Sequence, residues 1–154
     1  MLQVVDIVRI DHFRGFDLYY KIPADRSTAQ GGRWVNGPKI GFFRALSTGL
    51  GRELDQLPII AEDLGDDLGA AIDLRKALGL PGMAILQFAF GGTEADQNRF
   101  LPTNHEPNTI VYTGTHDNNT VLGWWDCEAG DWDRGRLCRF IGQETPDEPH
   151  WEMI

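Results

Sequence analysis

Four short segments of the chain are nearly continuous runs of apolar residues, a pattern typical of strands that are buried on both faces. The runs cover residues 4–11, 57–62, 83–90 and 109–115. Between them, apolar residues recur at three- and four-residue steps, which predicts helices over residues 42–54, 68–78 and 133–141. Strands that alternate with helices indicate βαβ units and a parallel sheet. The predicted fold class is therefore α/β.

A long connection at about residues 16–40 follows the first predicted strand. It contains Pro23, Gly31, Gly32, Gly37 and Pro38, so the sequence predicts a loop. It is long for a connection between a strand and a helix, and long loops of this kind are usually functional.

Polar residues gather at the carboxyl ends of three predicted strands. Arg9 and Asp11 end the first strand, Glu62 and Asp63 end the second, and His116 and Asp117 follow the fourth. The carboxyl edge of a parallel sheet is where α/β enzymes carry their chemistry. Side chains at i and i+2 share a face of a strand, so Arg9 and Asp11 are expected to point the same way and Glu62 and Asp63 opposite ways.

The three acids Asp11, Glu62 and Asp117 suit the cleavage of a glycosidic bond. That reaction needs one ionised carboxylate at the sugar carbon and one protonated carboxyl that donates to the leaving oxygen. Arg9 is expected to keep Asp11 ionised by charge pairing. Glu62, in an apolar strand, is the candidate for the protonated group.

The spacing of the acids alone leaves a structural interpretation open. Acids at strand ends often cap the next helix, and Asp63, Asp66 and Asp67 are candidates to cap the helix that starts near Leu68. Asp66 and Asp67 also lack the oxygen-rich loop spacing of a calcium site. No HExxH or other ligand spacing is present, so no metal is predicted.

Composition and sequence patterns favour some binding partners and cellular compartments over others. With 14 Lys and Arg against 23 Asp and Glu, the formal net charge is −9, which disfavours nucleic acid as a partner. The apolar runs are interrupted well before the about 18 residues of a membrane helix, so a soluble protein is expected. The first residues carry no secretory signal pattern, which favours the cytoplasm. Cys127 and Cys138 lack CxxC spacing and are expected to be plain thiols.

Four longer strings carry a resemblance to a known family. They are VRIDHFRGF at 8–16, IAEDLG at 60–65, PGMAILQFAF at 81–90 and YTGTHDNNT at 112–120. In this order and spacing they resemble the 4-α-glucanotransferases, the amylomaltase or disproportionating-enzyme family of the α-amylase superfamily. Four motifs of this length in one order are more specific than any single short pattern.

The resemblance implies a (β/α)8 barrel enzyme that cuts an α-1,4-glucosidic bond with retention and transfers the glucan to the 4-hydroxyl of another sugar. It implies that Asp11 is the nucleophile, Glu62 the general acid/base and Asp117 the third acid. Arg9 and His116 correspond to residues that flank the nucleophile and bind the same sugar ring. The resemblance implies no cofactor, and an α-1,4-glucan donor with a glucose or maltooligosaccharide acceptor.

Several aromatic residues are candidate platforms for glucose rings. Trp34, in the string GGRWV of the long loop, is the first choice. The others are Phe16, Tyr19, Tyr20, Trp124 and Trp125.

A whole barrel takes about 250 residues, whereas this chain shows four strands. By the resemblance these correspond to strands four to seven, so the expected organisation is one internal fragment of the catalytic domain over residues 1–154. Two alternatives stay open: a hydrolase of the α-amylase type, whose short motifs share the acids, and a truncated fragment without activity. A plastid location is the expectation for a plant source.

Overall fold

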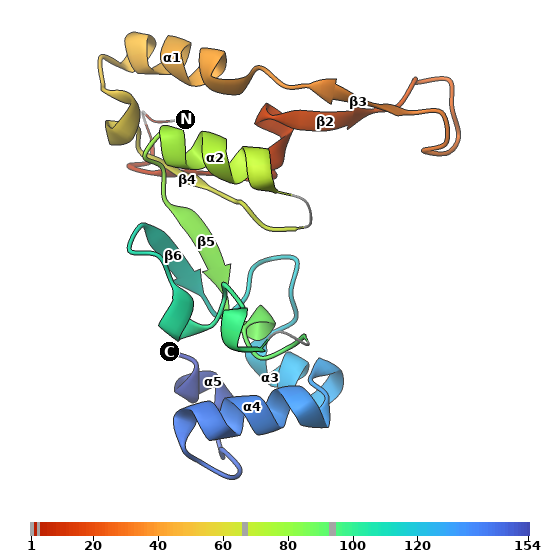
Figure 1. The fold of residues 1–154 in the computed structure, drawn as a ribbon, viewed down its shortest axis with the longest axis vertical. Helices are drawn as coiled ribbons and strands as arrows, with labels where there is room; N and C mark the ends of the chain where they lie inside the picture. Colours follow the sequence, from red (N-terminus) through yellow and green to blue (C-terminus); the bar gives the residue numbers. More distant parts are fainter. Residues whose placement is uncertain (1, 3, 66–67, 93–94) are drawn as a thin grey trace. The chain divides into compact units, whose positions relative to one another are not determined.

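The computed structural model describes residues 1–154 apart from 1, 3, 66–67 and 93–94 (Figure 1). It divides into two compact units, Met1–Met83 and Ala84–Ile154, and each is described by itself. Both units contain strands and helices, which confirms the α/β class. Asp66 and Asp67, predicted as helix caps, lie outside the described residues.

The first unit is built on a parallel pair of strands. β1 (Val8–Ile10) pairs with β4 (Ile59–Ala61), with Arg9 opposite Ile60, so the prediction of parallel pairing is confirmed here. Both strands are shorter than predicted, and the apolar residues before β1 are exposed. Those residues have no strand partner among the described residues, and apolar character without a partner does not make a strand.

Two helices pack against this pair. α1 (Lys39–Leu50) and α2 (Gly69–Ala77) confirm the first two predicted helices. α1 ends at Gly51, which adopts φ 62° and donates its N–H to Thr48 O, an ending that glycine permits because it lacks a Cβ. The core of the unit consists of Phe13, Phe43, Leu57, Ile59, Ala61, Leu78 and Leu80.

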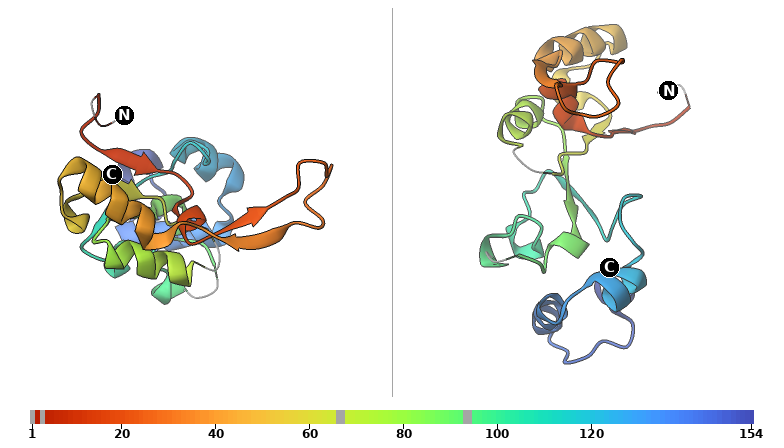
Figure 2. Two further views of the ribbon diagram at one scale, coloured as in Figure 1. Left: turned by 90° about the horizontal axis from the view of Figure 1, so that it is seen from above. Right: turned by 90° about the vertical axis from the view of Figure 1, so that its right-hand side faces the viewer.

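The prediction that residues 16–40 form a loop is wrong in part. The segment contains an antiparallel hairpin of β2 (Leu18–Lys21) and β3 (Arg33–Asn36), in which Tyr20 faces Trp34 across the pair. The hairpin extends away from α1 and α2 (Figures 1 and 2). Its base is fixed by an ion pair of 2.6 Å between Lys39 Nζ and Asp17 Oδ1. The hairpin was missed because its two strands are short and mostly exposed, so they show no buried apolar run.

The second unit begins within β5 (Gly82–Ile85), which pairs with β6 (Thr109–Tyr112). The predicted strand over 83–90 is too long, because Leu86–Phe88 form a 3-10 turn. The helices are α3 (Val121–Gly123), continued by a π turn at Trp124–Glu128, α4 (Asp131–Ile141) and α5 (Pro149–Glu152). α4 confirms the third predicted helix. The core consists of Leu86, Ala89, Phe90, Trp124, Ala129, Leu137 and Met153.

Two further predictions are tested by the fold. Cys127 is exposed and Cys138 is partly buried, and both are free thiols, as predicted. Within the part of the chain that the structure describes, every helix is too short or too polar to cross a membrane.

Candidate active site

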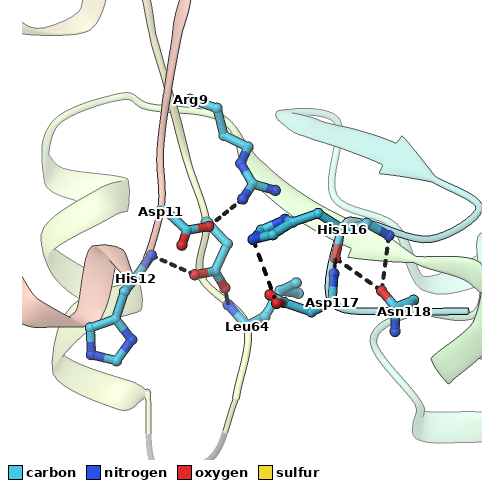
Figure 3. A network of polar contacts seen from close by, with 9 residues as sticks. Arg9, Asp11, His12, Leu64, His116, Asp117 and Asn118 are labelled. Carbon is cyan, nitrogen blue, oxygen red and sulfur yellow. Dashed lines mark hydrogen bonds and ion pairs between the residues drawn. The ribbon is translucent and has the colours of Figure 1, made fainter.

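The end of β1 presents an arginine and a carboxylate together. Arg9 lies on the strand and Asp11 directly follows it, and the Arg9 guanidinium forms an ion pair with Asp11 Oδ1 (Figure 3). The i, i+2 pattern predicted this shared face. The Asp11 side chain is 59% exposed against 24% for Arg9, so the carboxylate is open to a ligand while the arginine supports it.

The end of β4 places a second carboxylate beside the first. Glu62 directly follows the strand, and its backbone N–H donates to Ile10 O over 2.9 Å. Its Oε2 accepts the His12 N–H over 2.6 Å, and its Oε1 accepts the Leu64 N–H over 2.7 Å (Figure 3). The Glu62 carboxyl is therefore held next to the residue that follows Asp11. Each oxygen of the Glu62 carboxyl thus accepts a backbone N–H.

His12 follows the predicted first strand and has a left-handed backbone conformation. It has φ 51° and ψ 52°, because β1 ends at Ile10 and a 3-10 turn begins at Phe13. This left-handed conformation turns the His12 N–H toward Glu62, while its ring points away from Asp11 (Figure 3). Sequence reasoning missed this backbone donor, and histidine is among the few residues enriched at positive φ.

The second unit brings His116 and Asp117 together in the loop after β6. His116 Nε2 lies 3.5 Å from Asp117 Oδ1, and their side chains are 60% and 78% exposed (Figure 3). Asn118 fixes the loop, because its Oδ1 accepts the Thr115 N–H over 2.9 Å and the Thr115 hydroxyl over 3.0 Å. Sequence reasoning missed Asn118, although an asparagine after a strand is a signal for such a turn.

Trp34 stands out from the hairpin. The residue is 54% exposed, with the Tyr20 ring at 5.4 Å and the Arg14 guanidinium at 4.6 Å from its ring centre. Arg14 is three residues beyond Asp11, so the tryptophan lies against the turn that follows the candidate nucleophile. Tyr19 and Tyr20 are also exposed.

The remaining predicted platforms are packing residues. Phe16 packs among Phe13, Phe42 and Phe43, and Trp124 is part of the second core. Trp125 is partly buried against the same core. Packing against a core removes apolar area from water, almost completely for Trp124 and in part for Phe16 and Trp125.

Asp63 does not cap the following helix, so that interpretation is wrong for this residue. Its carboxylate is buried and pairs with Arg75 of α2. Glu62 and Asp63 have separate partners: Glu62 accepts the His12 and Leu64 N–H groups, whereas Asp63 contacts Arg75 and Met83. Among the described residues, no group of three or more His, Cys, Asp and Glu side chains is placed to hold a metal ion.

In chemical terms, the first unit offers two carboxyl groups at one edge of a parallel strand pair, one of them paired with an arginine. Such a pair can supply an ionised nucleophile and a proton donor to a glycosidic bond. The second unit offers an exposed histidine and carboxylate that can bind hydroxyl groups.

The chain is similar to curated proteins over almost its whole length. It is 44% identical over 149 residues to the chloroplastic/amyloplastic 4-alpha-glucanotransferase of Arabidopsis thaliana, covering 97% of this chain and 25% of that protein. It is 44% identical over 154 residues to the 4-alpha-glucanotransferase of Synechocystis, covering 99% of this chain and 29% of that protein. The chain thus spans about a quarter to three tenths of these relatives.

A solved structure has a similar fold. The amylomaltase from Streptococcus agalactiae in complex with acarbose has a TM-score of 0.83 and 36% identity, with 96% of this chain and 28% of that chain covered. The family model described as 4-alpha-glucanotransferase matches residues 1–154. The motifs, the carboxyl pair at the strand ends and these similarities agree, and the chain belongs to the 4-alpha-glucanotransferase family.

Proposed function

We propose that this chain carries the catalytic carboxyl groups of a retaining 4-α-glucanotransferase. Asp11 is the nucleophile, Glu62 the general acid/base and Asp117 the third acid, while Arg9, His116 and Trp34 bind the substrate. The observation that carries the proposal is the position of Asp11 and Glu62 at the ends of two adjacent parallel strands, joined by the hydrogen bond from His12 N–H to Glu62.

The reaction follows from these positions in two steps. Glu62 gives its proton to the leaving oxygen of an α-1,4-glucan while the Asp11 carboxylate forms a bond to the sugar carbon. Glu62, now ionised, takes the proton from the 4-hydroxyl of an acceptor sugar, whose oxygen displaces Asp11. Arg9 orients Asp11 through their ion pair. Two displacements at one carbon return its original configuration.

The proposal extends to the catalytic domain that contains this chain, to its substrates and to its cellular compartment. The four strands β1, β4, β5 and β6 with their helices correspond to strands four to seven of a (β/α)8 barrel, and residues 1–154 belong to one catalytic domain. Parallel pairing of β1 with β4 supports this, as does the similarity to the amylomaltase structure. The donor is an α-1,4-glucan and the acceptor glucose or a maltooligosaccharide. The enzyme acts in the cytoplasm, or in a plastid for a plant source, consistent with bacterial and chloroplastic/amyloplastic relatives.

The test uses a chimera in which residues 1–154 replace the matching segment of the Synechocystis relative, because the chain covers 29% of that protein. The chimera is incubated with maltotriose and the products are separated by chromatography. Transfer produces glucose and a ladder of longer glucans. Only shorter sugars would indicate a hydrolase instead, and an unchanged substrate beside an active Synechocystis parent would contradict the proposal.

Trp34→Ala in the chimera is expected to raise KM for maltotriose about 3- to 10-fold and to leave kcat unchanged. Stacking on an aromatic ring contributes about 0.5–1.5 kcal/mol, and a platform away from the reacting bond binds ground state and transition state equally. Initial rates over a range of maltotriose concentrations measure both constants. The control is Trp132→Ala, which removes another exposed tryptophan. An unchanged KM in Trp34→Ala would contradict a platform at Trp34.

Asp117→Asn in the chimera is expected to lower kcat/KM about 10- to 100-fold. The third acid binds sugar hydroxyls more strongly in the transition state, but it forms no bond to the sugar carbon. Mass spectrometry of the enzyme with a slow fluorinated maltosyl substrate should therefore still detect the covalent adduct. Asp126→Asn, a change of another exposed acid in the same unit, is the control. An adduct that disappears in Asp117→Asn would contradict this division of roles.

A further inference from the structure

A buried ion pair lies directly behind Glu62. Asp63 and Arg75 are 2% and 4% exposed, and Arg75 Nε lies 3.1 Å from Asp63 Oδ2. Asp63 Oδ1 accepts the Met83 N–H over 2.8 Å. Arg75 Nη1 donates to Leu80 O over 3.0 Å. The pair therefore connects the end of β4, the helix α2 and the start of β5 through charged and hydrogen-bonding groups.

Asp63 and Glu62 are neighbours on opposite sides of the chain. On the Glu62 side, hydrogen bonds run from Glu62 N–H to Ile10 O and from Phe13 N–H to Glu62 O, over 2.9 and 3.1 Å. On the Asp63 side, the ion pair holds the chain to α2 and β5. The backbone at Glu62 is thus fixed from both sides, which restricts where its carboxyl can lie.

The residue at position 82 keeps this arrangement possible. A Cβ at Gly82 would lie 2.7 Å from Asp63 Oδ2 and 2.9 Å from Arg75 Nε, closer than real Cβ contacts. Any side chain at this position would push the two charged groups apart or move β5. Glycine at position 82 is therefore part of the arrangement that lets Asp63 and Arg75 pair next to β5.

Stability alone does not account for such a pair. Two charges taken out of water cost several kcal/mol, and apolar residues of similar volume often stabilise a fold equally well. A carboxylate in this place, unlike an apolar residue, forms an ion pair and a hydrogen bond with defined directions. These contacts hold the backbone one residue from the proposed general acid/base.

We infer that Asp63 and Arg75 are positioning residues that set the Glu62 carboxyl for proton transfer. The inference rests on the proposed function, in which Glu62 is the acid/base. Asp63 and Arg75 touch no substrate, and they act through the backbone between residues 62 and 63. Their loss affects the steps that need Glu62 and spares the steps that do not.

The test compares two reactions of the chimera. With maltotriose, departure of the sugar needs a proton from Glu62. With α-maltosyl fluoride, Asp11 forms the bond to the sugar carbon while fluoride leaves with the bonding electrons and needs little protonation. Azide then forms a bond to the same carbon and displaces Asp11, and it has no proton to give up. The second reaction therefore bypasses Glu62 in both steps.

Asp63→Asn is expected to lower kcat for maltotriose about 10- to 100-fold with KM within about twofold, whereas the rate with α-maltosyl fluoride and azide stays within about threefold. Asparagine keeps the oxygen that accepts the Met83 N–H and removes the charge. Asp73→Asn changes an exposed acid on the same helix and is the matched control, with both rates unchanged. An equal loss in both reactions, or no loss in either, would overturn the inference.

The same two reactions are measured for Glu62→Gln. The comparison distinguishes a failure of the positioning role from a failure of the proposed function. If Glu62→Gln also loses both reactions equally, the acid/base assignment itself fails. If Glu62→Gln loses only the maltotriose reaction and Asp63→Asn loses both or neither, only the positioning role fails.

The double variant Asp63→Asn, Arg75→Met keeps the test decisive if the single variant folds poorly. It leaves no unpaired buried charge, so its melting temperature is expected to return toward that of the parent chimera. Its kcat for maltotriose is expected to stay low, because the ion pair between residue 63 and α2 is gone. A kcat that recovers together with the melting temperature would show a purely structural pair and overturn the inference.

Discussion

Asp11→Asn is expected to lower the transfer rate of the chimera with maltotriose about a thousandfold or more. The uncharged amide cannot form the covalent bond to the sugar carbon, so the two-step route is closed. The change should barely affect folding, because the Asp11 carboxylate is 59% exposed and ion pairs of exposed carboxylates contribute little to stability. The loss would therefore report on chemistry and not on an unfolded chain.

The measurement combines initial rates with mass spectrometry of the covalent adduct formed by a slow fluorinated maltosyl substrate. In the parent chimera the adduct should map to the peptide that contains Asp11, and in Asp11→Asn it should be missing. Asp6→Asn, an exposed acid five residues earlier, is the control and should keep both rate and adduct. An adduct that persists in Asp11→Asn, or one on another acid, would contradict the assignment of the nucleophile.

The strand pairing could be predicted from the sequence because both strands lie within apolar runs, although only β4 is largely buried and β1 is partly buried throughout. β1 and β4 show this run and pair in parallel as expected. The hairpin β2–β3 could not be predicted in the same way, since most of its side chains are exposed and its pairing depends on contacts at its base, such as Lys39 with Asp17. An exposed hairpin leaves little trace in an apolar pattern.

In the candidate site too, features that depend on local chain geometry could be predicted, and features that depend on tertiary contacts could not. The shared face of Arg9 and Asp11 follows from strand geometry alone. The hydrogen bond from His12 N–H to Glu62 needs a left-handed residue after β1, which a strand pattern does not reveal. Asp63 was open to interpretation as a cap because its partner Arg75 meets it only through the packing of α2.

For the aromatic residues, the sequence does not reveal which side chains are exposed and which are buried. Trp34 and Trp124 were both candidate platforms for sugar rings, yet Trp34 is exposed whereas Trp124 is part of a core. Residue type alone cannot separate these outcomes, because a tryptophan gains from burial in a core as well as under a ligand. The packing around each tryptophan determines whether it is buried in a core or exposed to a ligand.

Glu62→Gln is expected to lower kcat with maltotriose about 10²- to 10⁴-fold, the usual contribution of a general acid/base. Glutamine has nearly the same shape and keeps an oxygen for one of the two N–H donors, so the neighbourhood of His12 and Leu64 should change little. What disappears is the proton that the leaving sugar needs. With α-maltosyl fluoride and azide the loss should be within about tenfold, because neither step requires that proton.

The product of the azide reaction adds a check on the order of bond changes. If Asp11 first forms the covalent intermediate and azide then displaces it, the sugar carbon is inverted twice and the product is the α-maltosyl azide. Nuclear magnetic resonance of the isolated product distinguishes this from the β form. Glu53→Gln changes an exposed glutamate of the same unit and should behave like the parent. A β product, or an equal loss with both donors, would show that Glu62 is not the acid/base of a double displacement at Asp11.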